Sequence, residues 1–169
     1  MLEPDHRPLV GIVLGSDSDL PVMEAAGEVL RQFGVRYEMR ILSAHRSPEP
    51  TADYARSAAD RGLRVLIAGA GWAAHLAGAL AAQSILPVIG VPIDSSPLNG
   101  IDALLATVQM PPGIPVACMA LGKGGAKNAA FFAVAILALE FPQLAQQLVR
   151  YRQDLARQVL EKDARLEQP

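Results

Sequence analysis

The chain has 169 residues, which is enough for one sizeable domain and too few for two of typical size. Hydrophobic residues make up 51% and charged residues 19%, a composition that excludes a disordered chain. The formal net charge is -2 and no run of basic residues is present, so nothing points to nucleic-acid binding. We therefore expect residues 1–169 to form a single globular domain.

The sequence also argues against export and against a membrane span. Its first residues, "MLEPDHRP", are charged and contain proline, unlike a signal peptide. Glycine, proline or polar residues interrupt every apolar run before it reaches the length of a membrane span. The single cysteine, Cys118, allows no disulfide within the chain and is expected to be a small core residue. We expect a soluble, cytoplasmic protein with no membrane or nucleic-acid partner.

Apolar runs and amphipathic segments alternate along the chain. In chain order they predict a strand over 8–15, a helix over 19–34, a strand over 35–42, a helix over 47–62, a strand over 63–71, a helix over 73–84, a strand over 86–93, a helix over 99–110, a strand over 114–121 and a helix over 126–140. This alternation is typical of a parallel sheet with helices on both faces. We predict a three-layer, flavodoxin-like α/β fold whose five strands follow the order 2-1-3-4-5.

Two segments at the end of the chain complete the predicted architecture. The helix at 126–140 is hydrophobic nearly all round and should be buried. A long polar, amphipathic helix follows Pro142 and extends to about residue 166, beyond a core of about 8–140. Its apolar stripe is formed by Leu148, Tyr151, Leu155 and Val159. Long terminal helices of this kind often pack on a neighbouring subunit.

Polar or glycine-rich loops follow the first three predicted strands. They read "GSDSD" (15–19), "SAHRSP" (43–48) and "GAGWAAHLAG" (69–78). In a doubly wound sheet, ligands bind beyond the carboxyl ends of the strands, and these three strands are neighbours in the predicted order. We therefore expect one cleft to contain Ser16, Asp19, Ser43, His45, Arg46 and His75.

The residue types in this cleft indicate a phosphorylated sugar ligand and proton transfer. Arg46 offers a planar fork for a phosphate, and Ser43 adds a hydroxyl donor. Asp19 could accept hydrogen bonds from ribose hydroxyls, or it could simply cap a helix. His45 titrates near neutral pH and is suited to general acid/base chemistry. For His75, a structural role and a ligand contact are equally compatible with the sequence.

Several other ligand classes lack their sequence signatures. The third loop has alanine at position 74 where the dinucleotide pattern requires glycine, and residues 122–130 do not match a phosphate-binding P-loop. The chain has three histidines, of which His6 lies in the tail, and their spacing is unlike that of metal ligands. We expect no metal site and no dinucleotide or nucleoside triphosphate.

These loops, followed by "LPVIGVP" and "VQMPPGIPVACMALGK", resemble the N5-carboxyaminoimidazole ribonucleotide mutase family of purine biosynthesis, within the AIR carboxylase superfamily. The resemblance covers roughly residues 9–140. It implies a homo-octamer that moves a carboxylate from the exocyclic nitrogen of the substrate to ring carbon 4 without metal, ATP or organic cofactor. It also implies phosphate binding by Ser16, Ser43 and Arg46, ribose binding by Asp19, a proton shuttle at His45, and a cradle for the imidazole and carboxyl groups at Ala70, Gly71, His75 and Leu76.

Two residues depart from the family pattern, and two other functions remain open. Trp72 and Ala77 stand where the family commonly has glycine and proline, and Trp72 could form a subunit contact or part of the pocket wall. The nearest alternative function is AIR carboxylase, which carboxylates aminoimidazole ribonucleotide (AIR) with free CO2 or bicarbonate. A non-enzymatic flavin- or nucleotide-binding module of the same fold is the other alternative, although Trp72 is the only tryptophan, tyrosine or phenylalanine in the predicted cleft.

Overall fold

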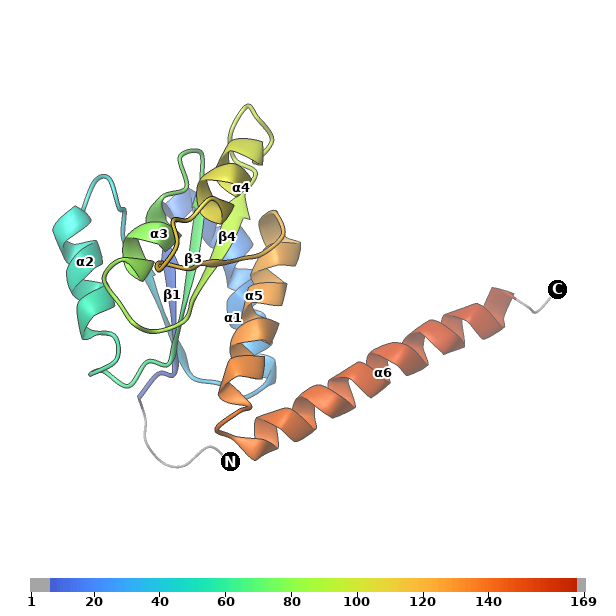
Figure 1. Cartoon of the computed structure of the whole chain (residues 1–169). Helices are drawn as coiled ribbons and strands as arrows, with labels where there is room; N and C mark the ends of the chain where they lie inside the picture. The colour runs from blue at the N-terminus through green and yellow to red at the C-terminus, as the bar shows by residue number, and fades with distance from the viewer. Residues whose placement is uncertain (1–6, 167–169) are drawn as a thin grey trace.

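A computed structural model describes residues 7–166 of the chain as a doubly wound α/β fold (Figure 1). Its five-stranded sheet has the order β2-β1-β3-β4-β5, and every neighbouring pair of strands is parallel. The strands are β1 (Val10–Leu14), β2 (Tyr37–Ile41), β3 (Val65–Gly71), β4 (Val88–Ile93) and β5 (Ala117–Cys118). The predicted fold class and strand order are therefore confirmed.

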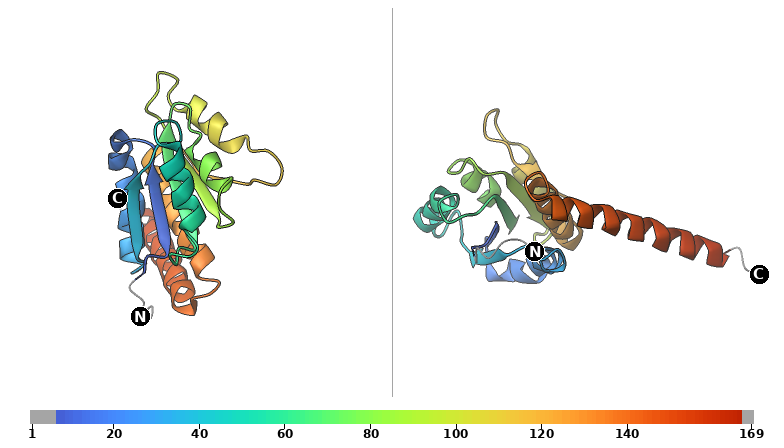
Figure 2. Two further views of the ribbon diagram at one scale, coloured as in Figure 1. Left: turned by 90° about the vertical axis from the view of Figure 1, so that its left-hand side faces the viewer. Right: turned by 90° about the horizontal axis from the view of Figure 1, so that it is seen from below.

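Helices cover both faces of the sheet (Figures 1 and 2). One face carries α1 (Leu20–Gln32) and α5 (Gly122–Leu137), which pack against each other. The other face carries α2 (Pro48–Ser57), α3 (Leu76–Ala81) and α4 (Ile101–Val108). A short 3-10 helix, η1 (Asp17–Asp19), precedes α1. The sheet is thus enclosed on both sides, as the continuous apolar strands predict.

Successive residues of β3 show how the two layers of core are built. Val65 and Ile67 belong to the apolar cluster beneath α1 and α5, whereas Leu66 and Ala68 belong to the cluster beneath α2 and α3. Adjacent side chains of a strand point to opposite faces, so a strand covered on both faces needs an apolar residue at every position. All four residues are buried.

The second half of the fold departs from the sequence expectations. Helix α5 is not buried all round in this chain. Its alanine face, including Ala129 and Ala133, packs against α1 and the sheet, but Phe132 is 42% exposed. The expected strand 114–121 is reduced to β5, because the preceding segment contains Pro111, Pro112 and Pro115, which lack the N–H needed for sheet pairing.

Cys118 lies on this short edge strand and is half-buried instead of being a full core residue.

Helix α6 (Pro142–Leu166) projects from the rest of the molecule (Figures 1 and 2). Leu148 and Tyr151 pack on the core, whereas Leu155 and Val159 of the same stripe are exposed. Within residues 7–166, no helix is both long enough and apolar enough to span a membrane.

Candidate active site

The loops at the carboxyl edge of the sheet enclose a cavity of about 520 Å³. Four strands contribute to it, because β1, β2, β3 and β4 end side by side at this edge. The cavity is lined by Gly15, Ser16, Ser18, Asp19, Ser43, Ala44, His45, Arg46, Ala70, Gly71, Trp72, Ala73, Leu76 and Ser95. The convergence expected from the sheet order is therefore present.

The loop after β1 is held by hydrogen bonds that Ser16 forms with Asp19 and Ser18. The Ser16 backbone N–H donates to Asp19 Oδ2 over 3.0 Å, and the Ser16 hydroxyl accepts from Ser18 N at 3.4 Å. Asp19 is only 4% exposed, and this burial raises the pKa of its carboxyl group. Ser16 is therefore the N-cap of η1, and Asp19 completes its capping box as well as lining the cavity.

The loop after β2 is folded around the Ser43 side chain. Ser43 Oγ accepts a hydrogen bond from Arg46 N at 3.1 Å, and Arg46 Nη2 donates to Gly15 O at 3.0 Å. The second bond ties this loop to the loop after β1. No carboxylate of residues 7–166 forms an ion pair with Arg46. The positive charge of Arg46 is thus positioned in the cavity and available to an anionic ligand.

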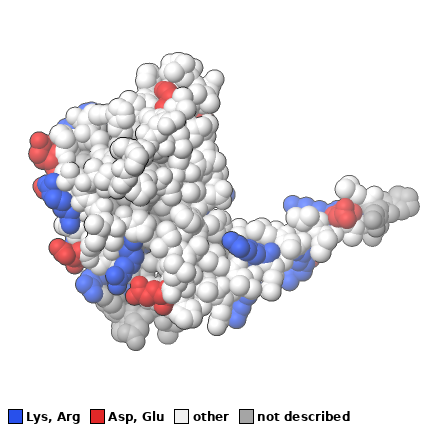
Figure 3. Space-filling view, in the orientation of Figure 1, with Lys and Arg blue, Asp and Glu red and all other residues white. Residues whose placement is uncertain are grey.

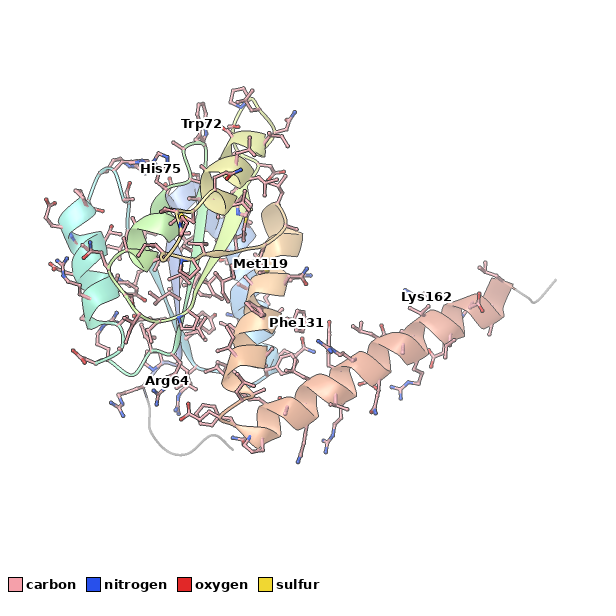
Figure 4. The ribbon with its side chains drawn as sticks, viewed as in Figure 1. Arg64, Trp72, His75, Met119, Phe131 and Lys162 are labelled. Carbon is pink, nitrogen blue, oxygen red and sulfur yellow. The ribbon has the colours of Figure 1, made fainter. Side chains whose placement is uncertain are left out.

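The loop after β3 brings a second histidine to His45. The two rings are perpendicular, with 2.9 Å between His45 Nε2 and His75 Nδ1. One of these nitrogens must carry the shared proton and the other must accept it, so at least one ring is neutral. His75 is positioned by a tight turn in which Ala74 N donates to Trp72 O and His75 N donates to Ala73 O. Trp72 and His75 lie together on this loop in Figure 4.

Trp72 has a backbone conformation that is unusual for its residue type. Its φ of 53° is in the left-handed region, which costs a non-glycine residue about 1–2 kcal/mol. The family's common glycine would adopt this conformation without that cost. Trp72 lies in the cavity lining, as one of the two placements considered for it requires.

All but one of the predicted site residues line the cavity. The exception is His75, which reaches the site through its hydrogen bond to His45. Those that line it are Ser16, Asp19, Ser43, His45, Arg46, Ala70, Gly71 and Leu76.

Ser95 is the main lining residue that the sequence reasoning missed. It follows β4, and a β-carbon added at Gly71 would lie 2.0 Å from Ser95 Oγ. Glycine at position 71 therefore allows the two loops to approach each other. A signal for Ser95 was available, since β4 neighbours β3 in the predicted sheet order and its carboxyl end carries "DSS" (94–96).

The cavity lining combines two kinds of residue. Ser16, Ser43 and Arg46 supply hydroxyl groups and a guanidinium, whereas Ala70, Gly71 and Trp72 supply small or apolar walls. The histidine pair contributes imidazole nitrogens that can donate or accept a proton. Fold and site together define a doubly wound α/β protein with a small-molecule site at the carboxyl edge of its sheet.

Comparison with known proteins agrees with this geometry. A model of the AIR carboxylase family matches residues 9–158. N5-carboxyaminoimidazole ribonucleotide mutase of Pyrococcus horikoshii is 56% identical over 163 residues, covering 96% of this chain and 91% of that protein. The enzyme of the same name from Thermotoga maritima is 52% identical over 161 residues, covering 95% and 93%.

A solved structure supports the same assignment. The crystal structure of Treponema denticola PurE has a TM-score of 0.85 and 31% identity, covering 96% of this chain and all (100%) of that chain. The chain belongs to the AIR carboxylase family. The family expected from the sequence motifs is therefore confirmed.

Proposed function

We propose that this protein is an N5-carboxyaminoimidazole ribonucleotide mutase of purine biosynthesis. The observation that carries the proposal is the placement of His45 beside Arg46 in one cavity, with His75 hydrogen-bonded to the His45 ring. The names of the relatives that are 50–58% identical support the same activity. The product is the isomer that carries the carboxylate on carbon 4 of the imidazole.

The polar lining residues bind the ribose phosphate in this proposal. Arg46 supplies the charge, and the hydroxyls of Ser16 and Ser43 supply hydrogen bonds. The Arg46 guanidinium is already fixed by Gly15 O and Ser43 Oγ, so little side-chain entropy is lost when the phosphate binds. Asp19 lies in the same cavity as Arg46, and its carboxylate accepts hydrogen bonds from the ribose hydroxyls.

His45 carries out both proton transfers. As an imidazolium it protonates the exocyclic nitrogen while the N–C bond breaks, and that bond's electron pair stays on nitrogen as CO2 departs. Carbon 4 then attacks the same CO2 and forms a C–C bond, and neutral His45 removes the carbon 4 proton to restore the aromatic ring. His75 holds the His45 ring through the 2.9 Å contact. These reaction steps use one proton and return it to His45, and they need no ATP, metal or organic cofactor.

The small and apolar lining residues retain the CO2 in this proposal. Ala70, Gly71, Ala73 and Leu76 present backbone and aliphatic side chains to the cavity, so the ligand packs closely and few waters share the space. Long polar side chains would bring water to the reacting centre. Ala70, Gly71 and Leu76 of the predicted cradle for the imidazole and carboxyl groups are among these residues, whereas His75 contacts His45.

Direct assay of the two possible carboxyl sources tests the proposed reaction. The purified protein is supplied either with N5-carboxyaminoimidazole ribonucleotide or with AIR and bicarbonate, and formation of the carbon 4 isomer is followed by ultraviolet absorbance. We expect rapid conversion of the first substrate and slow conversion of the second at modest bicarbonate. Efficient use of AIR under the same conditions would instead identify a carboxylase.

We also propose that the working form is a cytoplasmic homo-octamer. Ile101, Leu105 and Val108 of α4 are exposed apolar residues, as is Leu98 in the turn before it, and α6 exposes its distal stripe. In Figure 3 few charged side chains cover the middle of the molecule, whereas charges gather beside α2 and along α6. Native mass spectrometry gives the subunit number. Deleting residues 153–169 should lower it, because α6 then loses its exposed apolar residues without loss of buried core.

A further inference from the structure

Trp72 combines a strained backbone with a place in the cavity wall. It is one of two non-glycine residues with positive φ in residues 7–166, and the other is Asn99, a residue type that tolerates this region. The indole is 58% exposed, so burial in this chain's core does not explain why a large residue is kept there. Strain of this kind persists where the side chain has a use.

Trp72 lines the cavity on the same loop that carries His75 to His45. It lies three residues before His75, in the turn that presents His75 to His45. The neighbouring lining residues Ala70, Gly71 and Ala73 are too small to cover a ring. Apart from His45, Trp72 is the one lining residue with an aromatic ring, and an indole face is a good stacking partner for a flat heterocycle.

We propose that Trp72 contacts the substrate, covering the aminoimidazole ring and retaining the CO2 freed from it. This inference rests on the proposed mutase function. If CO2 escapes before carbon 4 attacks it, the protonated amine leaves as AIR, and each escape yields one AIR and one CO2 in place of one isomerised product. Trp72 therefore determines the ratio of released AIR to product. A chain with glycine at this position would have to cover the ring in another way.

Ligand titration followed by fluorescence tests the contact itself. Trp72 is the only tryptophan of the protein, so emission excited at the red edge of tryptophan absorption reports on this residue alone. We expect AIR to change the emission in a saturable manner. Inorganic phosphate, which should bind only beside Arg46, should leave the emission unchanged. Saturable binding of AIR by calorimetry with no change in emission would overturn the contact.

Measurement of AIR release tests the effect on CO2. Trp72→Gly should raise the ratio of AIR to isomerised product about tenfold, the size expected for losing one stacked ring. Trp72→Phe should restore most of the retention, and Trp72→Leu should restore less because it lacks a ring face. The glycine variant removes strain, so poor folding is not expected. Ile85→Ala removes an exposed apolar side chain from the loop before β4 and serves as the control with an unchanged ratio.

The outcomes separate this inference from the proposed function. If the wild type converts N5-carboxyaminoimidazole ribonucleotide but Trp72→Gly leaves the ratio unchanged, the role in retaining CO2 is wrong. If Trp72→Gly lowers the subunit number in native mass spectrometry and leaves the ratio unchanged, Trp72 is a subunit contact instead. If the wild type makes no product yet AIR changes the emission, the mutase function fails while the contact with the ring is supported.

Discussion

The middle and the end of the same strands differ sharply in burial and chemistry. In β1 every residue from Val10 to Leu14 is buried, whereas the next two residues, Gly15 and Ser16, are only half-buried and line the cavity. In β3 the residues from Val65 to Gly69 are buried, and Ala70 and Gly71 again line the cavity. Stability and ligand chemistry are therefore supplied by adjacent segments of one strand.

This difference teaches that substitutions in the two regions should have separable effects. A side chain in the middle of a strand is surrounded by other side chains, so its loss leaves a cavity. A side chain beyond the carboxyl end faces solvent or ligand, so its loss changes binding or rate with little effect on unfolding. The four variants below test this separation.

The largest expected effect is on the rate of the His45→Asn variant. Asparagine cannot transfer a proton near neutral pH, so kcat should fall by about 10²- to 10⁴-fold. His45 is exposed, so the free energy of unfolding should change by less than about 0.5 kcal/mol. Stopped-flow assay and urea denaturation measure the two quantities. A variant with near-normal kcat would show that His45 is not the proton shuttle.

The next effect is on stability, in the Leu66→Ala variant. Leu66 is 0% exposed in the cluster beneath α2 and α3, so truncation should reduce the free energy of unfolding by about 2–5 kcal/mol. Leu160→Ala is the matched control, because Leu160 is 67% exposed on α6 and should cost less than about 0.5 kcal/mol in the isolated chain. Urea denaturation at a protein concentration low enough to keep the subunits dissociated measures the free energy of unfolding of both variants. Equal losses would contradict the division between buried strand and exposed extension.

The third effect is on substrate affinity, in the Arg46→Ala variant. Loss of charge-assisted hydrogen bonds to the phosphate should raise KM by about 10- to 100-fold, with a smaller change in kcat. Arg56→Ala is the matched control, since Arg56 pairs with Asp53 on the surface of α2 and should leave KM unchanged. Steady-state kinetics at fixed ionic strength measure both. If KM stayed normal and only kcat fell, the phosphate would have to bind elsewhere.

The smallest effect is expected at Asp19, which lies beyond the end of β1 and is both buried and part of the cavity lining. Burial raises the pKa of Asp19 in the folded chain, so the folded state holds this proton more tightly than the unfolded chain does. Folding stability should therefore decrease as the pH rises from the unfolded-state pKa of about 3.9 through the raised pKa. Asp19→Asn removes this dependence and should be more stable near neutral pH, by about 0.5–1 kcal/mol.

Urea denaturation at a series of pH values tests this linkage. The stability difference between Asp19→Asn and the wild type should shrink at about pH 4, where more of the wild-type carboxyl group is protonated. The same variant should bind the ribonucleotide more weakly, because a neutral amide is a poorer acceptor for ribose hydroxyls. A difference that stays constant with pH would mean that the Asp19 carboxylate is not destabilised by burial.

The amino-acid sequence by itself determined the class of fold, the strand order and most of the site. Continuous apolar runs alternating with amphipathic segments are compatible with few arrangements other than a covered parallel sheet. The short loops after its strands must then meet at one edge, which is why the sequence predicts that Ser16, Ser43 and Arg46 share a cavity, as they do. Family motifs in the same loops led to the same set of residues.

Tertiary structure alone decided the features that depend on distances between remote segments. The bond between His45 and His75 joins two loops of different strands, and the exposed outer face of α5 depends on which of its sides meets α1. The direction of the Trp72 side chain depends on a positive φ that sequence periodicity does not report. Local patterns specify which face of an element is apolar, but contact geometry arises only when separate elements pack against each other.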